Sequence, residues 1–324
     1  MTDEPPARAL WIEGRGKCAL VAEEIAAPAD GEVLIRARYG GISRGTESLV
    51  LSGGVPEDQF TAMKCPYQAG EFSFPIKYGY CVVGTVEAGP ERLLGRTIFC
   101  LHPHQSEFIV READVHEIPD GVPPGRAILA ANMETALNIV WDAGLLPGDR
   151  VAVFGAGVVG LLTAHIASRV PGAEVTLVDI NPQRREISAQ LGIGFAMPPD
   201  LPQECDLVVN CSASEAALSE ALACAGVEAR VVEASWYGDR AVNLKLGSAF
   251  HARRLSIVSS QVGTIPSSRS RRWTPARRMA KALELLNDAR LDLLISGETR
   301  FGALAEAYAE IIASPATLCH RIVY

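Results

Sequence analysis

The chain has 324 residues, of which 48% are hydrophobic and 21% charged, and its formal net charge is −8. This length and balance predict a folded protein with room for two domains. The acidic charge excludes a global attraction to nucleic acid or to an anionic membrane surface, so we expect neither as a partner. The sequence has no run of about 18 uncharged apolar residues, the length that a bilayer-spanning helix needs.

The cysteines indicate a reducing compartment. The chain contains 8 of them, scattered along its length, and no two have the C-x-x-C spacing. In a chain of this size the pattern predicts reduced thiols in small apolar sites of a cytoplasmic protein, because a disulfide framework is typical of small secreted domains.

The first 125 or so residues are predicted to be rich in β-structure. Short apolar stretches alternate there with Gly and Pro, and no helical period is sustained. The predicted strands cover residues 32–39, 81–86, 96–101 and 107–110. The pattern changes near Gly125: residues 126–143 carry apolar side chains at helical spacing, and this predicted helix ends at Gly144.

Strand and helix signals then alternate. Strands are predicted at residues 151–154, 175–178, 206–210, 230–234 and 255–260, with helices at 158–169, 182–191 and 215–223. This order predicts an α/β fold with a doubly wound parallel sheet of the Rossmann type. A further helix follows Trp273 to about residue 287, and residues 295–324 hold one more helix and a short final strand. We therefore predict a Rossmann domain, residues 126–289, inserted in a β-rich domain formed by residues 1–125 and 290–324.

A glycine-rich turn opens the first βα unit of the predicted sheet. Gly155, Gly157 and Gly160 form a G-x-G-x-x-G motif directly after a strand and before a helix. Gly155 permits the tight turn, Gly157 lets the backbone approach a pyrophosphate, and Gly160 lets the helix pack closely on the strand. The pyrophosphate would bind at the helix amino terminus, at Val158 and Val159, where free N–H groups favour negative charge.

The second strand of the unit ends in an acidic residue. Asp179 lies 19 positions after Gly160, where a carboxylate accepts hydrogen bonds from the ribose 2′-OH and repels a 2′-phosphate. This predicts a nicotinamide dinucleotide cofactor, NAD in preference to NADP. Arg184 and Arg185 follow closely and soften that preference.

The domain order and the segment PGDRVAVFGAGVVG resemble the medium-chain dehydrogenase/reductase superfamily, of the alcohol dehydrogenase type. The resemblance implies a GroES-like β-rich domain, oxidoreductase activity on a small-molecule substrate and a homodimer. The segment SRGTE also resembles bacteriochlorophyllide hydroxyethyl dehydrogenases of this superfamily, but over one short motif only.

The resemblance also shows which metal ligands this chain lacks. Members usually hold a catalytic zinc through the Cys of G-[IV]-C-x-[ST]-D and the His of G-H-E-x-x-G. Here Ser43 and Tyr80 stand at those positions, a third ligand would fall near Ala131, and the four-cysteine lobe of a structural zinc is missing. Because zinc favours thiolate, imidazole and carboxylate ligands, we predict a zinc-independent member.

Without a metal, the reacting carbonyl oxygen needs another proton donor. By resemblance, the segments around residues 43–47 and 80 face the nicotinamide. Tyr80 is the favoured donor, although its pKa of about 10 would need lowering for efficient base work. Thr46 is a candidate proton relay, and Glu47 either orients Arg44 or acts as an acid. The alternatives are a turn cap for Thr46, a structural ion pair for Glu47 and a space-filling role for Tyr80.

Other candidate residues lie in the predicted long helix and in one strand-end loop. The segment ANMETALNIV resembles the superfamily helix that opens onto the nicotinamide, which implies a cofactor contact for Thr135. Glu134 is either a buried acid near the site or a solvated helix residue. His102 and His104 flank a proline: they are ordinary loop histidines, a metal pair completed by Glu47 or Glu134, or, for His104 alone, a group that orients the substrate.

Two serines complete the predicted cofactor site. By resemblance, Ser212 and Ser235 follow strands whose loops line the adenosine and nicotinamide riboses, and Trp236 and Tyr237 either shape the pocket or belong to the core. The favoured function is NAD(H)-dependent interconversion of an alcohol and a ketone or aldehyde. The alternatives are an NADPH-dependent reductase of the quinone or ene type and a non-catalytic dinucleotide-binding relative.

Overall fold

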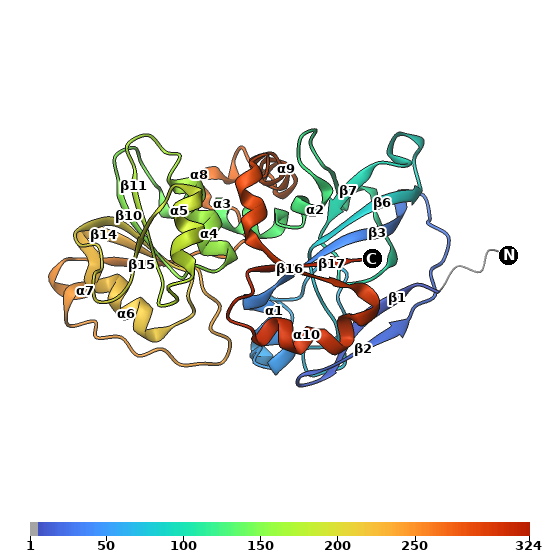
Figure 1. Cartoon of the computed structure of the whole chain (residues 1–324), viewed down its shortest axis with the longest axis horizontal. Coiled ribbons are helices and arrows are strands. Elements are labelled where there is room, and N and C mark those ends of the chain that lie inside the picture. The colour runs from blue at the N-terminus through green and yellow to red at the C-terminus, as the bar shows by residue number, and fades with distance from the viewer. Residues whose placement is uncertain (1–5) are drawn as a thin grey trace. The chain divides into compact units, whose positions relative to one another are not determined.

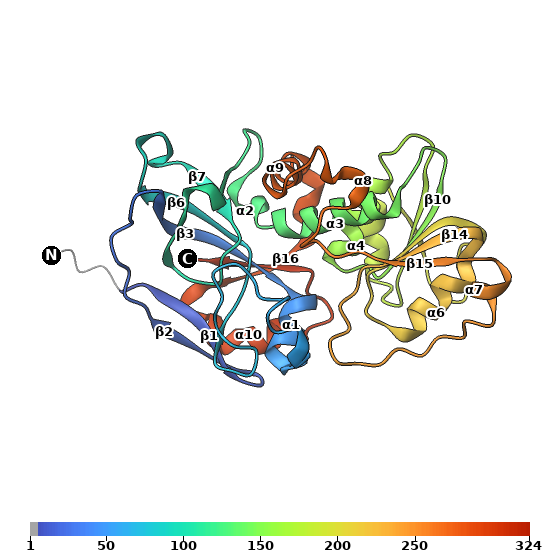
Figure 2. The ribbon, with the colours of Figure 1, turned by 180° about the vertical axis from the view of Figure 1, so that it is seen from behind.

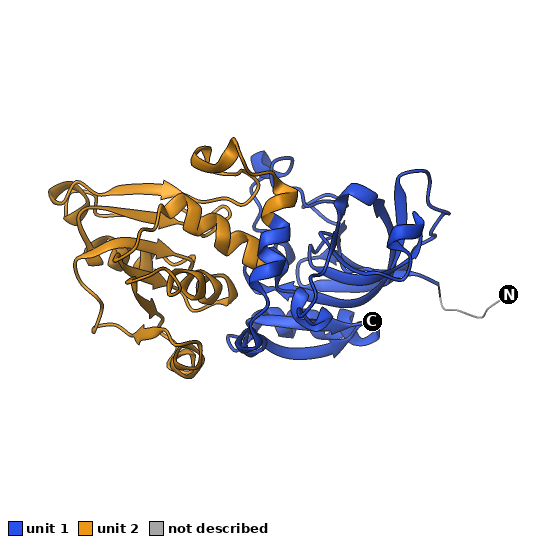
Figure 3. Cartoon of the chain, turned by 90° about the horizontal axis from the view of Figure 1, so that it is seen from above, with its two compact units in different colours: residues 1–131, 279–324 blue, residues 132–278 orange. Residues whose placement is uncertain are grey.

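The computed structural model of the protein describes residues 6–324, which divide into two units. Of the described residues, unit 1 comprises 6–131 and 279–324, and unit 2 comprises 132–278 (Figure 3). Unit 2 is therefore one uninterrupted stretch of chain, whereas unit 1 is assembled from both ends of the sequence.

Unit 2 is built on a six-stranded parallel sheet with the order β12-β11-β10-β13-β14-β15. Its strands are β10 (Arg150–Phe154), β11 (Glu174–Val178), β12 (Gly194–Ala196), β13 (Cys205–Asn210), β14 (Ala225–Glu233) and β15 (Ser256–Ser259). The order reverses between β10 and β13, the point at which ligands bind outside the carboxyl ends of such a sheet.

Helices flank this sheet because its strands are apolar on both faces. Val151, Ala152 and Val153 are all buried, so each face needs a cover. Helices α4 (Val158–Ala167) and α5 (Arg184–Leu191) belong to crossovers that lead away from β10 in one direction, and α6 (Glu215–Cys224) to a crossover in the other (Figure 1). Since such crossovers are right-handed, the two groups cover opposite faces. Unit 2 also contains α7 (Ala249–Ala252) and α8 (Ser267–Ser270). Two helices cross its ends: α3 (Ala130–Ala143) belongs to unit 2 from Asn132 on, and α9 (Pro275–Leu285) belongs to it up to Arg278.

Unit 1 contains two sheets. The larger has the order β16-β17-β3-β6-β7-β9, with β8 also paired to β3, and the smaller has the order β2-β1-β5-β4. The strands of the larger sheet are β3 (Glu32–Ser43), β6 (Val82–Ala88), β7 (Thr97–Cys100), β8 (Glu107–Arg111), β9 (Val115–Glu117), β16 (Ile295–Arg300) and β17 (Cys319–Val323). Those of the smaller sheet are β1 (Arg8–Gly14), β2 (Lys17–Ala22), β4 (Ala69–Gly70) and β5 (Ile76–Lys77).

The carboxyl-terminal segment completes unit 1. Strand β17 pairs antiparallel with β3, and β16 pairs parallel with β17. Helix α10 (Leu304–Ala313) lies beside β2 and α1 (Arg44–Ser52), as both views of the ribbon show (Figures 1 and 2). Residues more than 250 positions apart in the sequence are thereby brought into contact, as in the pair Glu47 and Tyr308.

Several elements differ from the predicted ones. The β-rich first 125 residues also contain a helix that no sustained helical period indicated: α1 follows β3 directly, and its C-cap residue Gly53 has the left-handed conformation. The predicted helix at 126–143 is interrupted: α2 (Pro124–Ala127) precedes α3, and Ile128 and Leu129 are not part of either helix. The hairpin β1–β2, strand β12 and strand β16 were not predicted; β12 and β16 carry no long apolar run.

Among residues 6–324, none of the helices has the length and apolar character needed to cross a membrane. All of the cysteines, from Cys18 to Cys319, are free thiols.

Candidate cofactor and active site

The glycine-rich turn of unit 2 has two glycines that the fold itself requires. Gly155 has φ +96°, a backbone conformation that favours glycine. A Cβ on Gly160 would lie 1.9 Å from the carbonyl oxygen of Gly155, so α4 packs against the turn only when residue 160 has no side chain. These two positions hold the tight strand-to-helix connection in place.

Gly157 differs from the other two glycines. It is exposed, and a Cβ added to it would meet nothing within 4 Å. It is the N-cap residue of α4, whose first residues are Val158 and Val159, and it offers no capping side chain to their N–H groups. The packing of the protein therefore does not require glycine at position 157. The close approach of an anion to the amino terminus of α4 would require it.

The carboxylate of Asp179 lies beside this turn. Its Oδ2 accepts a hydrogen bond from the backbone N–H of Ala156 at 2.6 Å, and its Oδ1 accepts one from Asn181 at 2.7 Å. The side chain is half-buried at the carboxyl end of β11. The next residue, Ile180, is 82% exposed, an unusual position for a large apolar side chain, and we did not single it out from the sequence.

The two arginines that follow do not share one environment. Arg184 is the first residue of α5 and is buried, while the guanidinium of Arg185 lies 4.9 Å from the ring centroid of Phe195. Arg184 is therefore enclosed by the protein, whereas Arg185 packs on an aromatic ring.

Polar side chains also meet at the carboxyl ends of β13 and β14. Asn210 is fully buried, and its amide nitrogen donates to Glu233 Oε2 at 2.7 Å. The hydroxyl of Ser212 donates to Asn210 Oδ1 at 2.7 Å, and the hydroxyl of Ser235 accepts from the N–H of Ala213 at 2.9 Å. Both serines thus shape the loops at the edge of the sheet where a dinucleotide would bind.

Asn210 and Glu233 were not among the predicted site residues. The signal was present, since each is a polar residue at the end of an apolar strand. Tyr237 joins them by donating from its hydroxyl to Glu233 Oε2 at 3.1 Å, and it is half-buried, as is Trp236.

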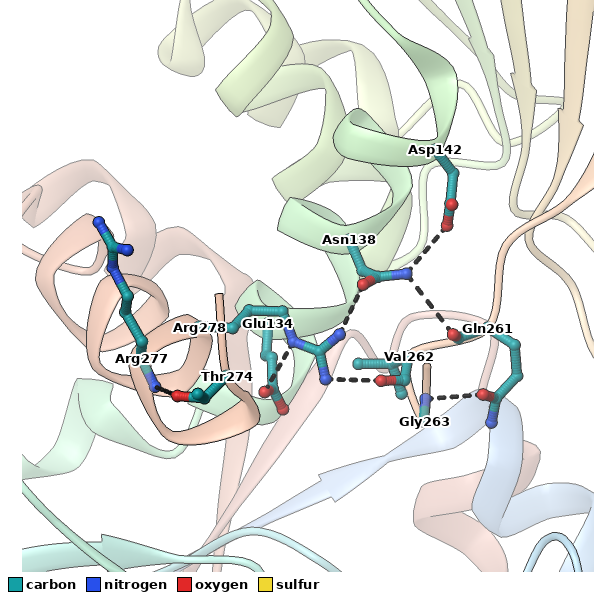
Figure 4. A network of polar contacts seen from close by, with 9 residues as sticks. All are labelled: Glu134, Asn138, Asp142, Gln261, Val262, Gly263, Thr274, Arg277 and Arg278. Carbon is teal, nitrogen blue, oxygen red and sulfur yellow. Dashed lines mark hydrogen bonds and ion pairs between the residues drawn. The ribbon is translucent and has the colours of Figure 1, made fainter. Parts of the chain in front are cut away.

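Glu134 belongs to a second buried network of unit 2 (Figure 4). Arg278 donates from Nε to Glu134 Oε1 at 3.0 Å, from Nη1 to Asn138 Oδ1 at 2.5 Å and from Nη2 to the carbonyl of Val262 at 2.6 Å. Burial raises the pKa of Glu134, and Arg278 opposes that shift. The interpretation of Glu134 as a solvated helix residue is wrong, because the side chain is buried against Arg278. Thr135 is half-buried beside it in the sequence.

In unit 1, three hydroxyls gather at the start of α1. The phenol of Tyr80 hydrogen-bonds the side chains of Ser43 and Thr46. Ser43 is buried, and Thr46 and Tyr80 are half-buried. Burial, and after it the negative charge of Glu47, raises the pKa of Tyr80 well above its ordinary range. The lowering that base work would need is therefore not provided, and Tyr80 is held as a neutral phenol.

Glu47 follows Thr46 in α1 and is fully buried. Its Oε1 accepts from the backbone N–H of Ser43 at 2.7 Å, and its Oε2 bonds His104 Nε2 at 2.8 Å and the hydroxyl of Tyr308 at 2.5 Å. The expected orientation of Arg44 by Glu47 is wrong: Arg44 Nε donates to the carbonyl of Ile312 at 2.9 Å instead. Tyr308 was not predicted, because it comes from a helix far along the chain.

His102 and His104 have different surroundings. The ring of His102 stacks on Phe108 with centroids 3.8 Å apart, and burial lowers its pKa to about 3. The ring of His104 instead contacts Glu47 and Tyr308. Within residues 6–324, no group of three or more His, Cys, Asp or Glu side chains is placed to hold a metal ion.

Comparison with known proteins agrees with this architecture. Residues 158–282 match the zinc-binding dehydrogenase family, a stretch that includes the turn residue Gly160 and Asp179 but neither Ser43 nor Tyr80. The chain is 25% identical to D-guloside 3-dehydrogenase of Escherichia coli strain K12, over 91% of this chain and 93% of that protein.

Two solved structures illustrate the fold and bind different cofactors. One is described as a short chain alcohol dehydrogenase from E. coli CFT073 in complex with NADH, with a TM-score of 0.79, 17% identity and coverage of 98% of this chain and 99% of that one. The other is a protein from Sinorhizobium meliloti 1021 bound to NADP, with a TM-score of 0.78, 17% identity and coverage of 99% and 100%. These likenesses confirm the predicted fold class.

Proposed function

We propose that this member of the medium-chain dehydrogenase/reductase superfamily is an NAD(H)-dependent oxidoreductase that interconverts an alcohol and a ketone or aldehyde without zinc. The observation that carries the proposal is the open Gly157 at the amino terminus of α4, with the carboxylate of Asp179 beside the same turn. The name of the relative D-guloside 3-dehydrogenase supports a sugar or polyol hydroxyl as the reacting group.

The residues present fit a nicotinamide dinucleotide. The N–H groups of Val158 and Val159 at the start of α4 would hold the pyrophosphate, and Gly157 leaves the backbone accessible there. The exposed side chain of Ile180 offers an apolar surface to the adenine beside the ribose-binding Asp179. The bound cofactor would supply the hydride acceptor or donor.

The preference for NAD over NADP rests on Asp179. A carboxylate next to the ribose would accept from its 2′-OH and would repel a 2′-phosphate. Both oxygens of Asp179 already accept backbone hydrogen bonds, which fix the carboxylate in place, and each oxygen has a further lone pair. Arg184 opposes this preference weakly, because its side chain is buried in the protein.

The protein's own part in the reaction is to move a proton at the substrate oxygen. We assign this role to the hydroxyl of Tyr80, oriented by Ser43 and Thr46. A phenol with a raised pKa still protonates an alkoxide, because the conjugate alcohol is about as weak an acid as water. Tyr80 therefore acts more readily as the donor in ketone reduction than as the base in alcohol oxidation.

The side chains at the expected metal positions do not fit zinc. Ser43 and Tyr80 supply hydroxyls in place of thiolate and imidazole, and the nearby Cys81 is buried, which raises the pKa of its thiol well above the ordinary range. His104 uses Nε2 to bind Glu47, so this imidazole is already held by the protein. The proposed reaction therefore uses no metal ion.

The test is a pair of fluorescence titrations with NADH and NADPH, followed by turnover with methyl D-guloside and 2-butanol as probes. We expect NADH to bind at least about tenfold more tightly, a difference of about 1.4 kcal/mol. Tighter NADPH binding would favour the quinone- or ene-reductase alternative, and the NADP-bound structural neighbour shows that this fold accepts a 2′-phosphorylated cofactor. Cofactor binding without turnover on either probe would favour a non-catalytic relative.

Two further properties belong to the same proposal. We expect a homodimer, measurable by light scattering, and a cytoplasmic enzyme whose free cysteines remain reduced.

A further inference from the structure

Three side chains from separate parts of unit 1 form a buried network, which we call the Glu47 network: Glu47 on α1, His104 in the loop after β7, and Tyr308 on α10. All three are 0% exposed. Both His104 Nε2, at 2.8 Å, and the Tyr308 hydroxyl, at 2.5 Å, bind the same carboxylate oxygen, Glu47 Oε2.

The direction of these hydrogen bonds follows from the chemistry of the groups. An ionised carboxylate only accepts, so His104 donates through Nε2 and Tyr308 through its hydroxyl. Burying a carboxylate without donors is strongly unfavourable, and hydrogen bonds to a charged group are stronger than those between neutral groups. Removing one donor therefore weakens the whole Glu47 network.

The network reaches the segment that contains Ser43 and Thr46. Glu47 Oε1 accepts from the backbone N–H of Ser43 at 2.7 Å, which fixes the first turn of α1. Thr46 lies in this turn, and Ser43 directly precedes it. The hydroxyls of both residues hydrogen-bond the phenol of Tyr80. The position of the carboxylate thus sets the position of Ser43 and Thr46.

The network also reaches the segment that contains Tyr80. The ring of His104 lies against Gly79, where a Cβ would be 2.9 Å from His104 Nε2. Gly79 has φ +126°, and it directly precedes Tyr80. The backbone N–H of His104 donates to the carbonyl of Tyr78 at 3.2 Å. His104 therefore packs on the segment that contains Tyr80, and its hydrogen bond to Glu47 connects it to the first turn of α1.

Tyr80 and its two partners depend on this link. The phenol comes from the segment after β5, and its partners come from the start of α1, so their hydrogen bonds form only when the two segments keep their relative position. Misplacing a reacting group by about 1 Å lowers a rate by about 100-fold.

We propose that the Glu47 network positions Tyr80, Ser43 and Thr46 for proton transfer by linking the two segments that carry them, with Tyr308 as a positioning residue supplied by the carboxyl-terminal helix. The inference rests on the proposed function for its catalytic part. Its structural part, the coupling of the two segments through Glu47, is independent of any substrate.

The first experiment measures amide hydrogen exchange of residues 43–47 and 78–81 in the full chain. In Tyr308→Phe the ring remains and one donor to Glu47 is lost, and we expect both segments to exchange about tenfold faster. The matched control is Thr317→Val, which removes a buried hydrogen bond of 2.8 Å to the carbonyl of Ile311 on the same helix. The control is expected to leave both segments unchanged. Equal exchange in Tyr308→Phe and the wild type would overturn the inference.

The second experiment separates positioning from general destabilisation. With methyl D-guloside or 2-butanol as probe, Tyr308→Phe is expected to lower kcat about tenfold and to leave the KM for NAD⁺ unchanged. Thr317→Val is expected to keep the wild-type kcat, even if its Tm falls by as much. A fall in kcat that follows Tm equally in both variants would overturn the positioning role.

Substitution of His104 tests whether it positions or reacts. Gln has an amide N–H donor for Glu47 but no imidazole, so His104→Gln is expected to keep kcat within about tenfold of the wild type and His104→Ala to lose about 100-fold. Failure of His104→Gln to restore kcat, with slow exchange restored, would overturn positioning as its role. Absence of wild-type turnover on both probes would overturn the proposed function and the catalytic part of this inference, while the exchange experiment would still decide the structural link.

Discussion

The cofactor turn of unit 2 and the Tyr80 site of unit 1 are built in different ways. Residues 154–160 are contiguous, and their shape is set by the backbone, by the absence of side chains at Gly155 and Gly160 and by the end of a strand. The Tyr80 site joins segments near residues 43, 80 and 104 and a helix near residue 308, through side-chain hydrogen bonds.

This difference decides where each site is sensitive. The turn tolerates change at the position that faces solvent and not at the positions that face the protein. The Tyr80 site depends on buried polar groups, each of which costs stability when it loses its partner.

The largest loss of stability is expected from breaking the buried ion pair of unit 2, Arg278 with Glu134. Arg278→Met would leave the carboxylate of Glu134 buried and without its cation, and we expect a loss of about 3–5 kcal/mol in the free energy of unfolding, measured by denaturant titration. The control Arg254→Met breaks an exposed pair with Glu228, and its effect should be far smaller. The double variant Glu134→Gln/Arg278→Met should recover part of the loss. Equal effects of the two arginine variants would show that the Glu134 pair contributes no more than a surface pair.

Alanine at Gly160 is expected to lower the stability of the protein, whereas alanine at Gly157 is expected to lower its affinity for the cofactor. Gly160→Ala places a Cβ 1.9 Å from the Gly155 carbonyl oxygen, and we expect it to destabilise the protein by about 3 kcal/mol. Gly157→Ala meets no protein atom within 4 Å, so its Tm should stay at the wild-type value while its affinity for NADH falls. Calorimetry and NADH titration on both variants check this. Wild-type NADH binding by Gly157→Ala would mean that the cofactor does not approach this face of the turn.

Acid should act on unit 1 through His102. Burial lowers its pKa to about 3 from 6.5, so protonation opposes folding, and the stability due to neutral His102 is complete above pH 6.5 and decreases as the pH falls towards 3. Near pH 5 the decrease should be about 2 kcal/mol. His102→Phe keeps an aromatic ring against Phe108 and removes the titration. Its unfolding free energy should vary less between about pH 6.5 and 5 than that of the wild type; an identical pH dependence would contradict the assignment.

The smallest effect concerns the choice of cofactor. Asp179→Asn keeps an oxygen for the N–H of Ala156 and removes the negative charge. We expect the preference for NADH over NADPH to decrease about tenfold, by weaker NADH and stronger NADPH binding. Paired fluorescence titrations measure it. An unchanged ratio would show that Asp179 serves the turn and not the ribose.

The same contrast explains how much could be read from the sequence. The turn from Gly155 to Gly160 was predictable because its residues are contiguous. Asp179 was predictable because a βαβ unit brings the end of its second strand beside the turn that follows the first. The partners of Glu47 were not, because Tyr308 reaches it only through the pairing of β17 with β3 and the packing of α10 on α1. Glu134 could not be identified as buried because its cation, Arg278, lies 144 positions further along the chain.

Some local features were also beyond the sequence pattern. Helix α1 has 9 residues, too few for a sustained apolar period, and its buried positions include the charged Glu47. Hydroxyl side chains at the expected ligand positions, Ser43 and Tyr80, were visible from the sequence, but the raised pKa of Tyr80 required knowledge of its burial and of the nearby Glu47.

The most direct test of a zinc-independent mechanism is the NAD⁺-dependent oxidation of methyl D-guloside or 2-butanol before and after exhaustive chelation, with the zinc content of the same samples determined by mass spectrometry. We expect chelation to leave the turnover unchanged and the active protein to hold far less than one equivalent of zinc. About one equivalent of tightly held zinc per chain, with turnover lost on its removal and regained on its return, would contradict this expectation.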